Sequence, residues 1–182
     1  MSGRVVVNRC MSLDGFIAGP GHDMAWGGRA LADFVDPDDF AAIAAATGAM
    51  LVGRTTWDVG DRIAAEHPER ADYPFAGPMF LLSHRPIDPP DPGVTILSGD
   101  IGDAVATALA AADGKDLELL GADVADQAFR RGLVDEVLVY VLPVLLGDGV
   151  RFAAPRLDLD PVSSRPSKDA TILRFRVRRP PA

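Results

Sequence analysis

The stretch Leu117–Gly149 constrains the fold of this chain more than any other. It opens with a short apolar run, Leu117–Leu120, which predicts a buried strand that ends at Gly121. Residues Ala122–Arg131 carry apolar side chains at helical spacing, and the Val- and Leu-rich run Val134–Leu142 predicts a long central strand. A strand, a glycine turn, a helix and a strand in this order form an α/β unit. The N-terminus of its helix directs free N–H groups at the open end of the sheet, where a phosphate binds readily.

The rest of the chain predicts further elements of the same sheet. Strands alternate with helices early and dominate at the end, which predicts an α/β fold. Its central sheet is expected to be mixed and mostly parallel, with helices on both faces and antiparallel strands at the C-terminal end. A Pro/Ser-rich turn is expected before the last strand. The other expected elements are strands at Arg4–Cys10, Met50–Val52, Pro78–Leu82, Val94–Leu97, weakly near Arg156–Leu159, and Ala170–Arg178, and helices at Asp36–Thr47 and Ile101–Ala112.

Length and charge narrow the class of protein. With 182 residues the chain is most simply one domain, residues 1–182, large enough to bury a core without disulfides. Its net charge of −8 argues against nucleic acids and anionic membranes as partners. The single cysteine, Cys10, excludes an internal disulfide, and no apolar run approaches the ~20 residues of a membrane span. Without a visible secretory signal, we expect a cytoplasmic protein.

Several well-defined catalytic signatures are absent from the sequence. No G-x-G-x-x-G follows the first predicted strand, and no G-x-x-x-x-G-K-[ST] occurs, which argues against a Rossmann dinucleotide site and a P-loop. G-x-S-x-G, H-E-x-x-H and C-x-x-C are missing as well. The three histidines follow no ligand spacing, so we expect no metal site.

Three predicted strand ends are followed by groups that suit a phosphate. Gly53-Arg54-Thr55-Thr56, where a helix or an irregular turn is expected to begin, offers a close backbone approach, a guanidinium and two hydroxyls. Ser83-His84-Arg85 follows the next strand, and Gly121-Ala122-Asp123-Val124 supplies N–H groups at a helix start. Each segment alone would be an ordinary turn or cap in most proteins. Three of them at the carboxyl ends of α/β strands favour a phosphate-rich cofactor along that edge of the sheet.

The segment Met11–Trp26 links the first strand to the first helix. It is rich in Gly and Pro, yet it keeps several large apolar side chains that a solvated linker does not need. This composition favours a loop that folds over a pocket, and the alternative is a loop simply packed on the core.

The chain resembles the dihydrofolate-reductase-like superfamily, and within it the reductase domain of the bifunctional riboflavin-biosynthesis deaminase/reductase. The resemblance covers nearly the whole chain and suggests a stand-alone member of that family. It is carried by motifs in the family's order, which are MSLDGFIAG (Met11–Gly19), LVGRTTWD (Leu51–Asp58), FLLSHRP (Phe80–Pro86) and LLGADVADQAFRRGLVDEVLVYVLPVLLGDG, the most specific of them.

The resemblance implies an NADPH-dependent reductase with no metal, and it implies roles for residues by position. Arg54, Thr55, Ser83, His84 and Arg85 would hold the 2′-phosphate side of the adenosine and the pyrophosphate. The segment Gly121–Val124 would cradle the pyrophosphate. Gly53 and Thr56 are also expected to bind the cofactor. The residues that would line the nicotinamide are Cys10, Ile17 and Ala18, and those on the substrate side would be Asp14, Trp26 and Asp39.

The roles of two of these carboxylates have an alternative interpretation. Asp14 would help to supply a proton, or would only shape the turn before Gly15. Asp38 or Asp39 would match the helix carboxylate that grips the pterin in folate reductases, or both would be ordinary first-turn charges. The sequence also departs from the pair of glycines common at the pyrophosphate turn, because Leu120 precedes Gly121.

Three functions therefore stay open. The first is an NADPH-dependent reductase that transfers hydride to a small pteridine- or pyrimidine-like ring, with water or a loop carboxylate as the proton source. The second is a nucleotide-binding module of the same fold without turnover, which the change at Leu120 favours. The third is a structural or interaction protein with no nucleotide site. The very apolar strand Val134–Leu146 suggests a homodimer, and the resemblance implies the same, because relatives of the riboflavin branch pair through sheet edges.

Overall fold

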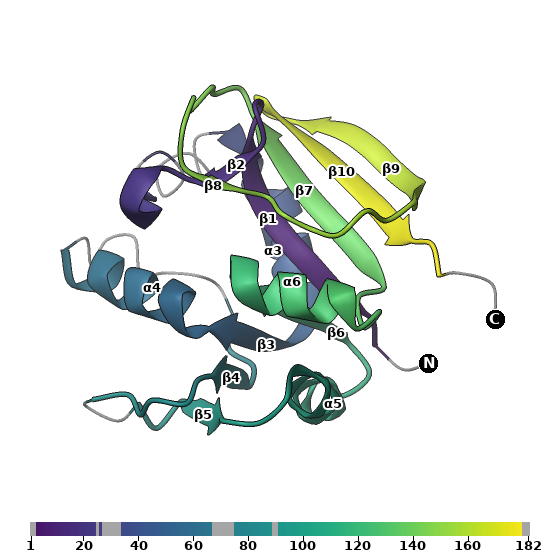
Figure 1. Cartoon of the computed structure of the whole chain (residues 1–182). Helices are drawn as coiled ribbons and strands as arrows, with labels where there is room; N and C mark the ends of the chain where they lie inside the picture. The colour runs from purple at the N-terminus through teal and green to yellow at the C-terminus, as the bar shows by residue number, and fades with distance from the viewer. Residues whose placement is uncertain (1–2, 25, 27–33, 67–74, 89–90, 180–182) are drawn as a thin grey trace.

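An eight-stranded sheet organises the computed structural model (Figure 1). The structure describes residues 3–24, 26, 34–66, 75–88 and 91–179. The strand order is β5-β4-β3-β6-β1-β7-β10-β9, and a two-stranded sheet pairs β2 with β8. The strands are β1 (Val5–Ser12), β2 (Phe16–Ala18), β3 (Thr47–Gly53), β4 (Met79–Leu82), β5 (Val94–Leu97), β6 (Asp116–Leu120), β7 (Glu136–Leu142), β8 (Val150–Arg151), β9 (Leu159–Ser167) and β10 (Ala170–Val177).

The six strands from β5 to β7 run parallel, and β10 and β9 are antiparallel. The predicted mostly parallel sheet with an antiparallel C-terminal end is therefore confirmed. The helices are a 3-10 turn η1 (Pro20–His22), α3 (Pro37–Ala46), α4 (Arg54–Glu66), α5 (Ile101–Ala111) and α6 (Ala122–Arg130). The expected helix or turn after Gly53 is the long helix α4.

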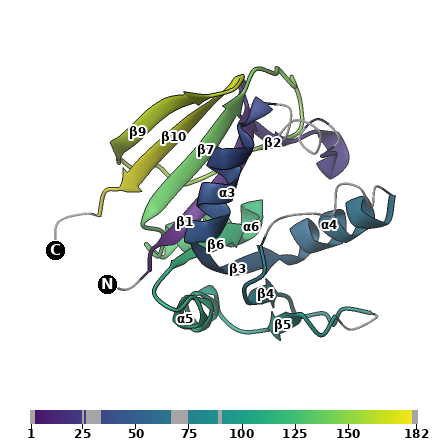
Figure 2. The same cartoon turned by 180° about the vertical axis from the view of Figure 1, so that it is seen from behind.

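Helices cover both faces of the sheet, as the sequence predicts. The helices α5 and α6 lie on one face in Figure 1, and α3 lies on the opposite face in Figure 2. The α3 helix forms where expected, since the Asp36 carboxylate accepts a hydrogen bond from the Asp38 N–H and Pro37 occupies the first turn.

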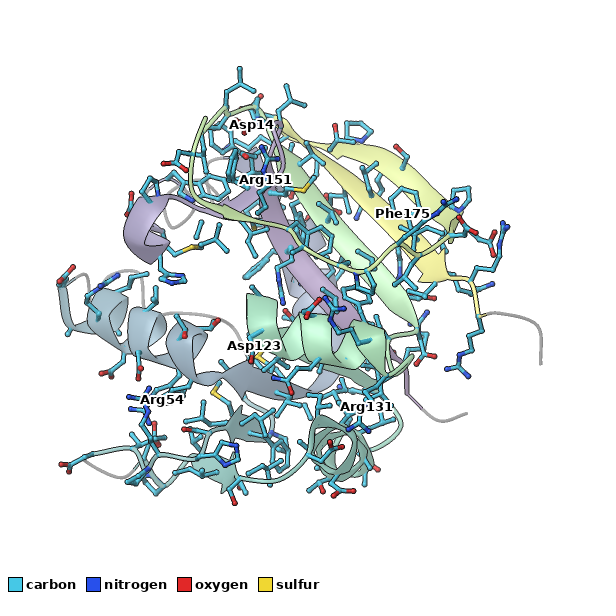
Figure 3. The ribbon with its side chains drawn as sticks, viewed as in Figure 1. Asp14, Arg54, Asp123, Arg131, Arg151 and Phe175 are labelled. Carbon is cyan, nitrogen blue, oxygen red and sulfur yellow. The ribbon has the colours of Figure 1, made fainter. Side chains whose placement is uncertain are left out.

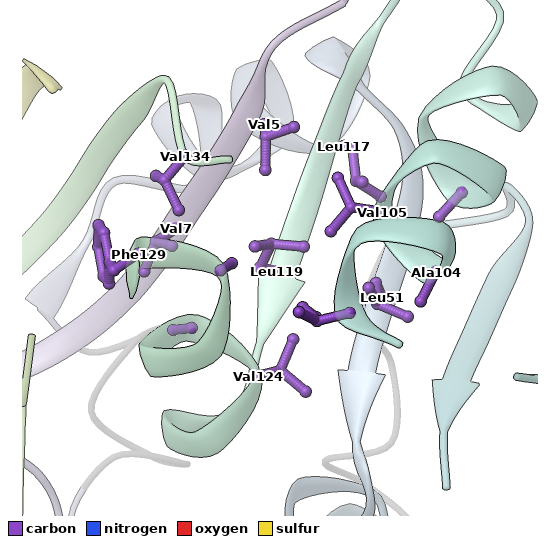
Figure 4. Packing of buried hydrophobic residues seen from close by; sticks show 14 of the residues in the cluster. Val5, Val7, Leu51, Ala104, Val105, Leu117, Leu119, Val124, Phe129 and Val134 are labelled. Carbon is purple, nitrogen blue, oxygen red and sulfur yellow. The ribbon is translucent and has the colours of Figure 1, made fainter. Parts of the chain in front are cut away.

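The main core lies between the sheet and the helices α5 and α6 (Figure 4). Leu51, Leu117 and Leu119 point from neighbouring strands to this face, and each is fully buried. Burial of one such side chain stabilises the fold by roughly 1.5–3 kcal/mol. This core fixes α6, because Val124 and Phe129 belong to the same cluster. The first turn of α6 therefore has a set position at the carboxyl edge of the sheet.

The strand β9 corrects one prediction. The sequence predicts a weak strand near Arg156–Leu159 followed by a Pro/Ser-rich turn, but that turn is itself a strand, Leu159–Ser167, paired along its length with β10. β9 is one of the two edge strands of the sheet. An edge strand tolerates Pro161 and Pro166, because one side of its backbone has no neighbour to pair with.

Buried charges join the strands at the end of the sheet opposite the start of α6, where β6 and β7 begin. The Glu136 carboxylate is 1% exposed and accepts hydrogen bonds from Arg174 Nε at 2.6 Å and from Arg4 Nη1 at 3.1 Å. Arg4 also pairs with Asp116, at 2.8 Å. This network links β6, β7 and β10, and the buried carboxylate depends on it, because a buried charge is costly unless it is paired.

No helix among the described residues is long and apolar enough to cross a membrane.

Candidate functional site

The three segments predicted to suit a phosphate come together at one edge of the sheet. They follow β4, β3 and β6, which are neighbours in the strand order and run parallel. The helices α4 and α6 begin one and two residues after β3 and β6, at Arg54 and Ala122. Two helix N-termini therefore lie side by side at the carboxyl ends of adjacent strands, the end of an open α/β sheet at which ligands bind.

Two glycines allow these helix starts to approach each other. Gly121 has φ of +113°, a conformation that L side chains rarely adopt. A Cβ at Gly121 would lie 2.9 Å from the Thr56 Oγ1 and 3.4 Å from the Gly53 backbone nitrogen. A Cβ at Gly53 would lie 2.9 Å from a methyl group of Val124. The backbones of the β3–α4 and β6–α6 turns thus pack directly against each other, and side chains at either glycine would separate them.

The start of α6 has free donors. Within the described part of the chain, no side chain caps this helix, and the Gly121 carbonyl accepts the first intrahelical bond, from the Ala125 N–H. The N–H groups of Ala122, Asp123 and Val124 precede that bond and therefore have no partner within the helix. The Asp123 side chain is exposed and accepts a hydrogen bond from Gln127 Nε2 at 2.7 Å.

Arg54 is held in place by the protein itself. Its Nε donates to the Asp58 carboxylate at 2.7 Å, and its Nη1 donates to the carbonyls of Pro86 at 2.8 Å and Arg85 at 3.2 Å. The guanidinium therefore ties the start of α4 to the loop that follows β4. Figure 3 shows it beside that loop.

The loop after β4 presents a more open cation. Ser83 is buried, and its hydroxyl donates to the Arg85 carbonyl and accepts from the Arg85 N–H, which shapes a tight turn. His84 and Arg85 are exposed beyond that turn. The Arg85 side chain is 72% exposed and lies 3.9 Å from the Asp58 carboxylate. Of the two arginines predicted to bind phosphate, Arg85 is the more accessible.

Arg9 is part of this edge, and the sequence interpretation missed it. It is 7% exposed, and its guanidinium donates to three backbone carbonyls, those of Leu119 at 2.7 Å, Gly121 at 2.8 Å and Asn8 at 2.5 Å. Burial lowers the pKa of Arg9 to about 10, with Glu118 acting in the opposite direction. The sequence did contain a signal for this role. A charged residue within the largely apolar run Arg4–Cys10 is costly to bury unless it forms hydrogen bonds, so Arg9 was a candidate for a specific polar contact.

The predicted nicotinamide residues lie at the end of β1 and on β2. Cys10 is half-buried near the end of β1, and Ile17 and Ala18 belong to β2. Burial raises the pKa of the Cys10 thiol to about 12, so the thiol is neutral at physiological pH. The guanidinium of Arg151 on β8 lies over the Phe16 ring, 4.4 Å from its centroid, which fixes this small sheet.

The Asp14 carboxylate joins two loops. It accepts hydrogen bonds from the Ser12 hydroxyl at 2.6 Å and from the N–H groups of Gly147 at 2.8 Å and Leu146 at 3.1 Å. These bonds, led by that from Ser12, lower the pKa of Asp14 to about 2. Figure 3 shows Asp14 near Arg151 in the loops beyond β1 and β7, away from Arg54. Asp14 is thus an ionised turn-forming residue in this conformation.

Asp39 and Trp26 lie on the α3 face of the sheet. Asp39 pairs with Arg165 at 2.6 Å, and hydrogen bonds from Ser167 and Arg165 lower the pKa of its carboxyl. The Trp26 ring packs against the cluster on this face that includes Tyr140, and the indole Nε1 and the Tyr140 hydroxyl are buried without a hydrogen-bond partner in the described structure.

A pocket of about 200 Å³ with several polar side chains in its lining lies between α3 and the sheet. Asp39 lines it with the buried Asn8 and Glu118, which hydrogen-bond each other at 3.1 Å. Because Arg165 and Arg174 also line it, the pocket offers carboxylates, an amide and guanidinium groups to a small polar ligand.

The comparisons with known proteins identify the family and the fold. The sequence model of the RibD C-terminal domain matches residues 4–168. Among solved structures, a protein named for riboflavin biosynthesis from Shewanella sp. PV-4 has a TM-score of 0.76 at 24% identity, over 97% of this chain and 99% of that one. A pyrimidine reductase-like protein from Corynebacterium diphtheriae has a TM-score of 0.64 at 15% identity, over 98% and 93%.

A third similar structure belongs to a longer protein. It is a diaminohydroxyphosphoribosylaminopyrimidine deaminase/5-amino-6-(5-phosphoribosylamino)uracil reductase from Thermotoga maritima, with a TM-score of 0.63 at 16% identity. The match covers 97% of this chain and 57% of that one, so this chain corresponds to little more than half of the bifunctional protein. At such identities these structures establish the fold. No curated protein matches the sequence.

Proposed function

This chain belongs to the RibD C-terminal domain family, and on that premise we propose that it is an NADPH-dependent reductase of a small pyrimidine- or pteridine-like ring. The observation that carries the proposal is the contact between the Gly53 and Gly121 turns. It sets the N-termini of α4 and α6 side by side at the carboxyl edge of the sheet. Two groups of N–H donors and two helix dipoles at one place suit a ligand with several phosphates.

The cofactor residues follow from this edge. We propose that the N–H groups of Ala122, Asp123 and Val124 bind the pyrophosphate, with Gly53 and Thr56 beside them. The 2′-phosphate would contact Arg85, His84 and Thr55, since Nε and Nη1 of Arg54 already donate to Asp58 and to two carbonyls. In this arrangement Arg54 and Ser83 shape the loop, and Arg85 supplies the accessible charge that distinguishes NADPH from NADH.

The nicotinamide, which supplies the hydride when it is bound, would lie at Cys10, Ile17 and Ala18. The neutral Cys10 thiol and the small Ala18 side chain provide an apolar wall that excludes water from the reacting atoms. The substrate ring would lie toward the α3 face, where Asp39 and Trp26 are found. The buried Asn8 and Glu118 beside Asp39 support a nitrogen-rich ring as substrate, because such rings present both donors and acceptors.

Water is the proton donor that this geometry favours. Asp14 is the carboxylate on the loop after β1, but three donors hold it and its pKa is about 2. A carboxyl that is ionised at neutral pH is a poor general acid. We therefore assign Asp14 the role of anchoring the loops beside the substrate rather than of transferring the proton.

One observation favours a second function, a nucleotide-binding module without turnover. Leu120 stands where the family resemblance implies the first of two glycines, and it is half-buried at the end of β6, directly before the proposed pyrophosphate turn. A side chain there changes the space available to the cofactor. We further propose that the protein acts in the cytoplasm as a homodimer, a state that light scattering at micromolar concentration would test.

The test is oxidation of NADPH, followed at 340 nm, with a panel of reducible pyrimidines, pteridines and flavins. Turnover of one ring class, with little turnover when NADH replaces NADPH, is the expected result. NADPH binding without turnover on any ring would support the binding module instead. No binding of either nucleotide would remove both proposals and favour a structural role.

A further inference from the structure

Arg9 lies where the central strands separate. The ladder between β1 and β6 ends at the pair Val7–Leu119, whereas β1 stays paired with β7 as far as Ser12. Two residues beyond the last β1–β6 pair, the Arg9 guanidinium bonds to the carbonyls of Leu119 and Gly121. Beyond the last backbone pair of these two strands, the Arg9 side chain thus supplies the hydrogen bonds that hold the β6–α6 turn against β1.

The charge of Arg9 is not explained by these contacts. Its three acceptors are neutral carbonyls, and it forms no ion pair with any acidic side chain that the structure describes. The buried Glu118 carboxylate raises the pKa of Arg9 electrostatically, without an ion-pair contact. It accepts hydrogen bonds from Asn8 and Thr47 and lines the pocket under α3. A buried cation that no carboxylate contacts is only partly compensated by a charge at a distance. The position of Arg9 adds to this cost. Arg9 bonds to Gly121 at the start of α6, where the helix dipole is positive.

An anion at the start of α6 would remove both costs. It would meet the free N–H groups of the first turn, the positive end of the helix dipole and the Arg9 charge behind Gly121. We propose that Arg9 is a positioning residue for the anionic centre of the cofactor: it fixes the Gly121 turn and supplies the counter-charge beneath the pyrophosphate. This inference rests on the proposed function and adds a residue from β1 to a site otherwise built from β3, β4 and β6.

Two ligands that contain no nicotinamide separate the role of Arg9 from that of the 2′-phosphate contacts. The first is 2′-phospho-ADP-ribose, which keeps the pyrophosphate, and the second is 2′-AMP, which lacks it. In calorimetric titrations of the full chain, we expect Arg9→Met to weaken 2′-phospho-ADP-ribose at least tenfold and to change the affinity for 2′-AMP less than twofold. The slope of log Kd against log salt should also become shallower for the first ligand only.

Arg130→Met is the matched control. It removes one positive charge from the last turn of α6, at the end of the helix away from Arg9, where Arg130 is exposed and pairs with Asp126 at 2.8 Å. The control should bind both ligands as wild type does. Equal losses for both ligands in Arg9→Met, or a loss no larger than in Arg130→Met, would overturn the inference. Failure of the wild type to bind either ligand would instead overturn the proposed function, and the inference with it.

A second substitution covers the case in which Arg9→Met does not fold. Arg9→Lys keeps the charge but has no planar fork with which to hold two carbonyls at once. We expect it to weaken 2′-phospho-ADP-ribose severalfold with the wild-type salt slope, and to leave the affinity for 2′-AMP unchanged. An affinity for 2′-phospho-ADP-ribose equal to that of Arg130→Lys would contradict a positioning role for the guanidinium.

Discussion

Replacement of Gly121 by alanine tests the packing of the two turns. Gly121 has φ of +113° and ψ of 136°. A non-glycine residue in such a sparsely populated region costs on the order of 1–3 kcal/mol. The added Cβ would also lie 2.9 Å from the Thr56 Oγ1, so the hydroxyl or the turn must shift. Lower entropy of the unfolded chain offsets at most about 1 kcal/mol. We therefore expect Gly121→Ala to lower the free energy of unfolding by about 2 kcal/mol.

Two other glycines provide matched controls. Gly132 has φ of +65°, and a Cβ there would have no atom within 4 Å. Gly132→Ala should therefore lower the free energy of unfolding only by the penalty of a left-handed backbone, about 1 kcal/mol. Gly60 lies exposed in α4, also with open space around it, and Gly60→Ala should stabilise the protein by roughly 0.5–1 kcal/mol through helix propensity. Stability should therefore decrease in the order Gly60→Ala, wild type, Gly132→Ala, Gly121→Ala.

The assay combines thermal unfolding with nucleotide binding. For a chain of this length, 2 kcal/mol corresponds to about 4–8 °C in Tm. Only Gly121→Ala should also weaken NADPH binding, by at least tenfold, because only this change separates the start of α6 from the start of α4. A Gly121→Ala protein as stable as Gly132→Ala, with wild-type affinity for NADPH, would refute the reasoning.

Three further predictions concern charged residues. Glu136→Gln should lower the free energy of unfolding in urea by about 2 kcal/mol, because it leaves two arginines without their buried carboxylate; a change below about 0.5 kcal/mol would contradict this. Asp14→Asn should destabilise the protein at pH 5 but not at pH 2. A carboxylate whose pKa is lowered to about 2 stabilises the fold when it is ionised, and this stabilisation is lost as the pH falls through that value. A difference in unfolding free energy between variant and wild type that does not change with pH would contradict this. Arg85→Met should weaken NADPH relative to NADH without lowering Tm, whereas Arg54→Met should lower Tm; the reverse pattern would exchange their roles.

The β6–α6–β7 unit was predictable because its signals are local and agree with one another. Gly121 marks the turn, apolar residues at helical spacing mark α6, and the helix ends at Arg130, just before Gly132. The convergence of Gly53 and Gly121 was predictable in outline, because parallel strands place their carboxyl ends at one edge. The direct contact between the two glycines was not predictable, since it depends on the register of β3 against β6.

The parts that the sequence did not predict depend on partners far away in the chain. β9 contains two prolines and was expected to be a turn, and only its place at the sheet edge makes the strand possible. Arg54 suits a phosphate by residue type, yet its donors bond to Asp58 and to carbonyls of a loop about 31 residues away. The role of Arg9 depends on where β1 and β6 separate, which no short motif records.

Binding of NADPH and NADH to the purified protein tests the central claim most directly. A fluorescence titration should show binding of NADPH at low micromolar concentration or tighter and at least tenfold weaker binding of NADH, with the preference reduced in Arg85→Met. Absence of binding for both nucleotides, in a protein that is folded by its thermal transition, would contradict a cofactor site at the ends of β3, β4 and β6.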